Sequence, residues 1–154
     1  MTRVGFGYDS HRFEEGRKLI LGGVEFEGET GLKGHSDADV LTHAIIDAIL
    51  GAAGLGDIGE HFPDTDPRFE GADSVKLLAA AVQEVEANGW KLGNVDATLI
   101  CERPKIAPKK QAMRERLEAV LKCPVGIKGK TNEKMDDIGA GKGIAAMCAA
   151  LIER

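Results

Sequence analysis

The sequence has few aromatic residues, three cysteines and no long apolar run among its 154 residues. A membrane-spanning helix needs roughly 20 consecutive apolar residues, and no stretch approaches that length. Residues 1–5 also lack the apolar core of a signal peptide. We therefore expect a cytoplasmic protein with no membrane partner.

The three cysteines, Cys101, Cys123 and Cys148, are widely spaced and form no CxxC pair. We expect reduced, mostly buried thiols rather than a disulfide framework or a zinc ribbon. Positive charge is also in deficit, because 20 Lys and Arg against 25 Asp and Glu give a net charge of −5. That balance argues against nonspecific nucleic-acid binding, but it allows a local basic pocket for one small phosphorylated ligand.

Glycine, by contrast, is abundant: it occurs 20 times, whereas aromatic residues make up only 5% of the chain. With few large side chains, helices are expected to pack closely through Ala and Gly. Part of the stability must then come from elsewhere, and subunit association is one source. No linker, low-complexity run or internal repeat divides the chain, so we expect one domain over residues 1–154.

Hydrophobic periodicity predicts strands interleaved with helices. The predicted strands cover residues 4–8 (ending at 9–11), 95–101 and 125–128, with a hairpin over 18–26. The predicted helices run from Ser36 or Asp37 to about 53, from 73 to 88, from about Pro108, and over 143–153. Residues 55–72 are expected to be mostly loop. This order indicates an α/β fold, an α+β sandwich in which one mixed sheet carries helices on one face.

The final segment, residues 143–153, repeats apolar residues at helical spacing. They fall at i, i+3, i+4, i+7 and i+8, as Ile144, Met147, Cys148, Leu151 and Ile152. Such spacing places apolar side chains on one face of a helix. We therefore expect the chain to end in a helix.

Asp9-x-His11 is the first pattern with a chemical meaning. Residues two apart on an extended segment project from the same face, so both side chains can reach one ion. His43 is a suitable third ligand, with Asp39 or Asp47 on its own helix face to accept its second ring N–H. Asp, His and His suit zinc and leave a fourth position open. The alternative is that Asp9 caps a turn and the histidines are surface residues.

Two further segments follow in the chain. Residues 34–39 (Gly-His-Ser-Asp-Ala-Asp) offer N–H and hydroxyl donors to an anion at a helix start, and His35 is the expected substrate contact. A plain capping sequence is the alternative. The acidic loop over 56–67 contains Asp64-x-Asp66, but Pro67 and the lack of later ligands argue against a calcium loop. It is either a functional loop or a solvated turn.

Two segments in the second half are candidates for holding phosphates. Lys105 lies in a stiff turn between prolines, and residues 130–134 (Lys-Thr-Asn-Glu-Lys) offer hydroxyl, amide, carboxylate and ammonium groups. Glu133 is a candidate magnesium ligand, because that ion takes one or two carboxylates plus phosphate oxygens. The Gly-rich run at 139–143 lacks the Walker spacing and is not a P-loop.

In this order, the segments resemble the 2-C-methyl-D-erythritol 2,4-cyclodiphosphate synthase family of the non-mevalonate isoprenoid pathway. The matching stretches are residues 5–11, 34–43, 50–59, 62–67, 93–96, 104–105 and 131–134. They extend over nearly the whole chain. The resemblance implies a single catalytic domain, 1–154, that assembles as a homotrimer with active sites between neighbouring subunits.

The same resemblance implies an enzyme, a metal-dependent phosphorus–oxygen lyase. Its substrate would be 4-diphosphocytidyl-2-C-methyl-D-erythritol 2-phosphate, whose 2-phosphate attacks the β-phosphorus, releasing CMP and closing the cyclodiphosphate. Asp9, His11 and His43 would hold Zn²⁺ or another divalent cation, and Glu133 a Mg²⁺ or Mn²⁺ on the diphosphate. His35 and Thr131 would stabilise the transition state.

The remaining substrate contacts are also implied by matching position. Near the erythritol part and the metal they are Asp9, His11, His35, Ser36, Asp57, Gly59, Phe62, Asp64 and Asp66. Around the cytidyl nucleotide they are Cys101, Lys105, Ala107, Lys130, Thr131, Asn132 and Glu133, the last four from a neighbouring subunit. The physical requirements agree, because cyclisation needs two anionic phosphates neutralised and aligned, and no nucleophilic side chain.

One region departs from the family pattern. Where many members have an apolar aromatic and then an arginine in the Gly-rich run, this chain has Asp137 and Ala140, with Asp136 and Lys142 nearby. The change removes an always-charged bidentate phosphate binder and adds two carboxylates. Contacts of that run, whether to substrate or to an anion at the trimer centre, are therefore not carried over.

Two other functions use the same residues. A metal-dependent phosphohydrolase would use the same ligands to activate water, and would give hydrolysed phosphates without a cyclic product. A non-catalytic metal- or nucleotide-binding trimer would bind CMP and zinc without ever releasing CMP from the substrate.

Overall fold

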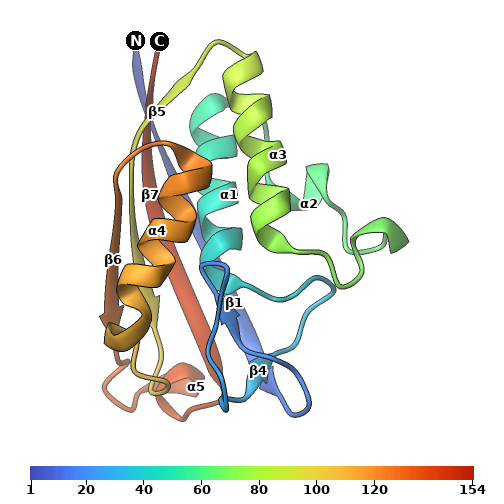
Figure 1. The fold of residues 1–154 in the computed structure, drawn as a ribbon, viewed down its shortest axis with the longest axis vertical. Coiled ribbons are helices and arrows are strands. Elements are labelled where there is room, and N and C mark those ends of the chain that lie inside the picture. The colour runs from blue at the N-terminus through green and yellow to red at the C-terminus, as the bar shows by residue number, and fades with distance from the viewer.

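The computed structural model describes all residues, 1–154. Figure 1 shows one long, twisted sheet with helices packed on one of its faces and both chain termini at the same end. Five strands form the sheet in the order β4-β1-β7-β5-β6. Their bounds are β1 (Thr2–Glu14), β4 (Gly31–Leu32), β5 (Lys91–Ile100), β6 (Val125–Lys130) and β7 (Gly143–Glu153).

The sheet is mixed, as predicted, because β5 and β6 are parallel whereas the other neighbouring strands are antiparallel. A small separate hairpin pairs β2 (Ile20–Leu21) with β3 (Val24–Glu25) around the expected Gly22-Gly23 turn. The main helices are α1 (Val40–Ala53), α3 (Ser74–Ala87) and α4 (Lys110–Leu121). The shorter ones are α2 (Ile58–His61), η1 (Pro67–Phe69), η2 (Ala107–Lys109) and α5 (Asp136–Gly139).

Helix α1 lies at the centre of the fold. It packs against β1 and β7 on one side and against α3 on the other. Of its residues only Asp47 and Gly51 are not buried. A helix that is apolar nearly all round is one enclosed on all sides, and this enclosure gives the side chains of α1 fixed positions.

The prediction of a C-terminal helix was wrong, because residues 143–153 form β7. This strand is central and pairs along its length with β1 and with β5. From Ala146 onward its side chains alternate between buried and more exposed, with Cys148, Ala150 and Ile152 facing the core. The same apolar residues satisfy both periodicities, and the two neighbouring strands decide in favour of the sheet.

Several element boundaries also differ from expectation; β5, for example, begins at Lys91 rather than at residue 95. β1 does not end at residues 9–11 but continues to Glu14, because Arg12 still pairs with Gly143 of β7. Helix α1 begins at Val40, capped by Asp39 rather than by Ser36 or Asp37. The buried Asp39 carboxylate accepts hydrogen bonds from the backbone N–H of Thr42, Gly22 and Gly23, which ties the helix start to the hairpin.

The face of the sheet opposite the helices is uncovered in the single chain. It exposes large apolar side chains of β1 and β7, with exposed fractions of 71% for Val4, 66% for Phe6, 51% for Tyr8 and 38% for Met147.

Helices of this protein are too short or too polar to traverse a lipid bilayer.

Candidate metal centre

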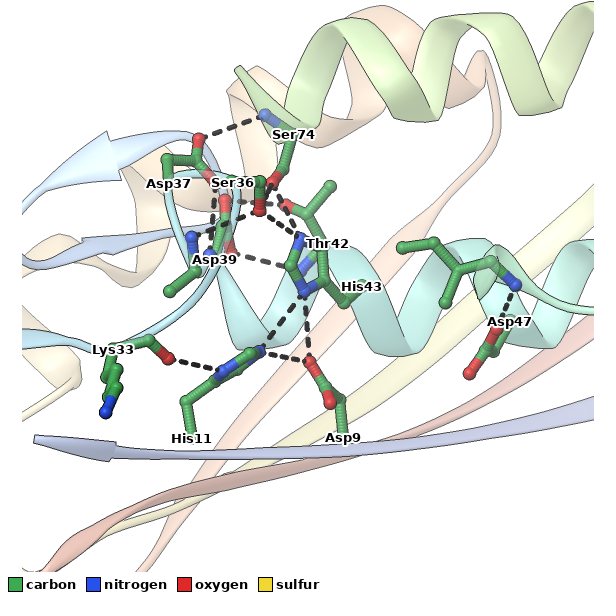
Figure 2. Close-up of polar contacts among 12 residues, drawn as sticks. Asp9, His11, Lys33, Ser36, Asp37, Asp39, Thr42, His43, Asp47 and Ser74 are labelled. Carbon is green, nitrogen blue, oxygen red and sulfur yellow. Dashed lines mark hydrogen bonds and ion pairs between the residues drawn. The ribbon is translucent and has the colours of Figure 1, made fainter. Parts of the chain in front are cut away.

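Asp9, His11 and His43 converge on one point between β1 and α1 (Figure 2). Alternation along β1 places Asp9 and His11 on the same face, as the sequence predicted. The Asp9 Oδ2 atom lies 2.8 Å from His11 Nε2 and 3.1 Å from His43 Nδ1, and the two nitrogens are 3.4 Å apart. Metal–ligand bonds of roughly 2.0–2.2 Å in a tetrahedron place ligand atoms about 3.3 Å apart, so the set fits one zinc ion.

Close contact between α1 and β1 is what brings His43 to Asp9. Gly5 and Gly7 face the helix, and a Cβ atom on Gly7 would lie 1.8 Å from the carbonyl oxygen of Ala44. On Gly5 it would lie 1.9 Å from the carbonyl oxygen of Ala48. Only glycine lets the two backbones approach this closely, and His43 is the residue next to Ala44.

The charges at this centre perturb one another. Burial alone would raise the pKa of Asp9, but hydrogen bonds and charge from His11 and His43 outweigh it and lower that pKa to about 2. Burial would lower the pKa of His11, but the hydrogen bond and charge of Asp9 outweigh it, so the pKa of His11 is raised. An ionised carboxylate beside two imidazoles is the arrangement that a divalent cation prefers to a proton.

These shifts predict the pH dependence of stability in the metal-free protein. The stability that ionised Asp9 contributes is fully present above pH 3.8 and is lost as the pH falls through about 2. The stability that protonated His11 contributes is fully present below pH 6.5 and is lost as the pH rises through the raised pKa of His11. Urea unfolding with chelator, compared between wild type and Asp9→Asn, should show the largest difference in free energy of unfolding between those limits. A difference that is constant from pH 3 to 9 would contradict the pairing.

The second nitrogen of each histidine has a partner. His11 Nδ1 lies 2.8 Å from the carbonyl oxygen of Lys33. His43 Nε2 lies 2.8 Å from Ser74 Oγ and 3.1 Å from Ser36 Oγ. Hydroxyl groups therefore orient His43, and not a carboxylate of its own helix as the sequence suggested. Asp39 is held at the helix start, and Asp47 accepts the backbone N–H of Ile58 at 2.8 Å.

A cavity of about 400 Å³ opens beside this centre. Besides the three candidate ligands, five other predicted residues line it: His35, Ser36, Gly59, Phe62 and Asp64. Asp57 and Asp66 lie in the same loop but do not line the cavity. Asp57 caps α2 through Glu60 N, and Asp66 forms an ion pair with Arg68 at 2.7 Å. The backbone carbonyl of Asp66 lies 3.0 Å from His35 Nε2, which ties His35 to the acidic loop.

A second hollow of about 340 Å³ lies at the far end of β5 and β6. It is lined by the predicted residues Cys101, Lys105, Ala107, Lys130 and Thr131. Asn132 and Glu133 follow directly in the chain but do not line it. Glu133 also stands outside the group of ligand atoms formed by Asp9, His11 and His43. In the single chain, therefore, the predicted site is divided between two hollows that share no residue.

Three residues at these sites make contacts that the sequence did not predict. Ser74 and the carbonyl of Lys33 orient the histidines, and Glu102 accepts the backbone N–H of Asn132 at 2.8 Å. Glu102 thereby joins the two segments that line the second hollow. No local spacing signals these contacts, because each links segments more than 20 residues apart.

The cysteines match expectation, since all three are free and buried. Burial raises the pKa of Cys101 to about 11, so this thiol in the second hollow is no nucleophile near neutral pH. In the Gly-rich run, Asp137 and Lys142 lie 3.4 Å apart as an exposed ion pair, and Ala140 ends α5. The positive charge of Lys142 is thus partly neutralised within the run.

A family model covers residues 2–153 of this chain, and it describes the YgbB family. This chain belongs to the YgbB family. A curated family member, the 2-C-methyl-D-erythritol 2,4-cyclodiphosphate synthase of Acaryochloris marina (strain MBIC 11017), is 54% identical over 153 residues. That match covers 97% of this chain and 95% of the relative. The resemblance inferred from the motifs is therefore confirmed.

Solved structures of the family share the fold. The bifunctional IspDF from Campylobacter jejuni matches 99% of this chain with a TM-score of 0.95 and 42% identity. This chain spans 42% of that longer protein. A structure of 2C-methyl-D-erythritol-2,4-cyclodiphosphate synthase in a CDP-bound form matches 98% of this chain and all of the other, with a TM-score of 0.90 and 41% identity.

Proposed function

We propose that this protein is a 2-C-methyl-D-erythritol 2,4-cyclodiphosphate synthase, acting on 4-diphosphocytidyl-2-C-methyl-D-erythritol 2-phosphate. One observation supports this above all. In a chain that matches the family over residues 2–153, Asp9, His11 and His43 meet at the cavity that His35 and Ser36 also line. In the reaction an oxygen of the 2-phosphate bonds to the β-phosphorus. The bond from that phosphorus to the bridging oxygen breaks, and CMP leaves with the bridging oxygen.

In this proposal, the residues divide between holding cations and holding substrate. Asp9, His11 and His43 would hold Zn²⁺ or another divalent cation, and Glu133 would contact Mg²⁺ or Mn²⁺. When bound, such cations neutralise phosphate charge and polarise the attacked phosphorus. His35 and Thr131 stabilise the charge that develops on the transferred phosphoryl group.

The other pocket residues orient the substrate. Gly59, Phe62 and Asp64 of the acidic loop line the cavity and would enclose the erythritol part, while Asp57 and Asp66 would contact it from the same loop. Ser36 binds beside the cation, while Cys101, Lys105, Ala107, Lys130 and Asn132 hold the cytidyl nucleotide. Fixing both ends of one flexible molecule brings its two phosphates together, which supplies a large part of the rate enhancement.

Product analysis tests this function directly. Purified protein with Zn²⁺ and Mg²⁺ should convert the diphosphocytidyl substrate into CMP and the cyclodiphosphate, followed by ³¹P NMR. Linear phosphates without a cyclic product would instead indicate a phosphohydrolase. Binding of CMP and zinc without any CMP release would indicate a non-catalytic protein.

A homotrimer with active sites between subunits completes the proposal. The division of the predicted site between two hollows supports it, since a neighbouring subunit would bring its whole second hollow to the metal cavity. Cys101, Lys105 and Ala107 line that hollow together with Lys130 and Thr131, so all five would come from the same neighbour, and not only residues 130–133 as expected from the sequence. The uncovered apolar face of β1 and β7 supplies a surface to bury in that contact. We also place the enzyme in the cytoplasm, where free buried thiols such as these are maintained.

Phe6→Asp is expected to dissociate this assembly, because it places a charge in the centre of the apolar face of β1. Analytical ultracentrifugation should show trimers for wild type and monomers for the variant, with activity lost in parallel. Gln83→Asp adds the same charge on the exposed surface of α3 and should stay trimeric. A Phe6→Asp protein that remains fully trimeric would contradict the use of this face.

A further inference from the structure

A chain of polar contacts extends from His43 away from the cavity and ends on Asp37 (Figure 2). His43 Nε2 lies 2.8 Å from Ser74 Oγ, and Ser74 Oγ donates a hydrogen bond to Asp37 Oδ1. Ser74 is completely buried and His43 is 8% exposed. The contact between His43 and Ser74 therefore lies inside the protein, where water does not compete with it, whereas Asp37 at the end of the chain is partly exposed.

The hydrogen-bond partners determine which atom carries the proton in each contact of this chain. Asp37 is surrounded by donors, because Oδ1 accepts from Ser74 Oγ and from the Asp39 N–H at 3.1 Å, and Oδ2 accepts from the Ser74 N–H at 3.0 Å. A carboxylate only accepts, so the single hydroxyl proton of Ser74 must point to Asp37. Ser74 Oγ then has only lone pairs left for His43, and Nε2 must carry the imidazole proton.

In the neutral imidazole, the form that binds a metal, this assignment leaves the lone pair of His43 on Nδ1, the atom that lies 3.1 Å from Asp9 Oδ2 and 3.4 Å from His11 Nε2. We propose that Asp37 and Ser74 are positioning residues that fix the tautomer and ring orientation of His43 for metal binding. The inference rests on the proposed metal-dependent function. Ser36 Oγ, at 3.1 Å from Nε2, is a second and longer acceptor of the same proton.

Asp37→Asn is the variant that tests the direction of these hydrogen bonds with almost no change in shape. The new amide can lie in two orientations. If its NH₂ takes the position of Oδ1, it faces the Asp39 N–H and donates a hydrogen bond to Ser74 Oγ, so the Ser74 proton turns toward His43 Nε2. If its NH₂ takes the position of Oδ2, it faces the Ser74 N–H. The first orientation favours the tautomer with its proton on Nδ1, which opposes metal binding. The second keeps the Ser74 proton on the carbonyl oxygen but sets the NH₂ against the Ser74 N–H, which pushes Ser74 out of its position beside His43.

The experiment measures the zinc dissociation constant by competition with a chromophoric chelator. Asp37→Asn and Ser74→Ala should each weaken zinc binding by about 10- to 100-fold, the usual effect of removing a partner behind a metal ligand. In the Ser74→Ala background, Asp37→Asn should have little further effect, because the link to His43 is already absent. ¹⁵N chemical shifts of the His43 ring should report the Nε2–H tautomer in wild type and a larger Nδ1–H population in Asp37→Asn.

Asp73→Asn is the matched control. Asp73 caps α3, the helix that begins at Ser74, by accepting a hydrogen bond from the Val75 N–H at 3.0 Å. The variant therefore makes the same change of charge beside the same helix start, but on a residue that does not act on His43. Its zinc affinity should stay within about twofold of wild type, since Asn caps helices as well as Asp does. Wild-type affinity in Asp37→Asn, or an equal loss in Asp73→Asn, would overturn the positioning role alone. Absence of zinc binding by the wild-type protein would overturn the proposed metal site as well.

Discussion

The His43→Ala variant should lose tight zinc binding. Its kcat/KM should fall by at least about 1,000-fold, equivalent to roughly 4 kcal/mol of transition-state stabilisation. His43 supplies one of three ligand atoms that lie within 4.8 Å of one another. Two ligands on one strand cannot by themselves hold a tetrahedral ion against water. Isothermal titration with Zn²⁺ and a CMP-release assay measure the two effects.

The fold of His43→Ala should persist, because alanine is the best helix former and α1 keeps its apolar contacts with β1, β7 and α3. Circular dichroism and urea unfolding of the metal-free protein check this. His61→Ala provides the control, since His61 bonds to the carbonyl oxygen of Leu55 and stands outside the ligand group. Its zinc affinity should match that of wild type. Unchanged zinc affinity in His43→Ala itself would refute the assignment of the ligands.

Gly7→Ala should destabilise the protein by about 3 kcal/mol or more, the upper range for forcing added volume into a packed interior. The new Cβ would lie 1.8 Å from the carbonyl oxygen of Ala44, and backbone cannot rotate away as a side chain can. Helix α1 must move off β1 by more than 1 Å to restore ordinary contact. Because His43 moves with the helix while Asp9 stays on the strand, zinc affinity should fall together with stability.

Gly51→Ala is the matched control on the same helix. Nothing lies within 4 Å of a Cβ atom added at Gly51, which faces solvent. Alanine there should stabilise the helix by roughly 0.5–1 kcal/mol and leave zinc binding unchanged. Urea denaturation gives both free energies. Wild-type stability and wild-type zinc affinity in Gly7→Ala would show that the close contact between α1 and β1 does not set the geometry of the site.

Local patterns predicted much of the local geometry around the candidate ligands correctly. Asp9 and His11 share a face because strand alternation is a property of the backbone alone. The extent of α1 to Ala53 and its end at Gly54 also follow from local rules, since Gly54 adopts the left-handed conformation that closes a helix. The pairing of His43 with Asp9 came from the choice of ligand types, and the structure places the two atoms 3.1 Å apart.

The wrong prediction of a helix over residues 143–153 shows the limit of such local rules. Ile144, Cys148 and Ile152 are four apart, and four is close to the helical repeat and also a multiple of the strand repeat of two. Alanine at four of the remaining positions favours a helix in isolation. The segment is nevertheless β7, because β1 and β5 supply backbone hydrogen-bond partners along both of its edges. A sequence pattern contains no information about such neighbours.

The sequence by itself thus determined the family and the three metal-ligand candidates that the structure brings together. Each of these depends on residue type and on spacing within a short segment. Tertiary structure alone decided the strand at the C-terminus, the contact of Gly7 with Ala44, and the partner of His43. Ser74 orients that histidine from 31 positions away, because α3 packs beside α1. Contacts of this kind depend on how elements pack, which no local pattern specifies.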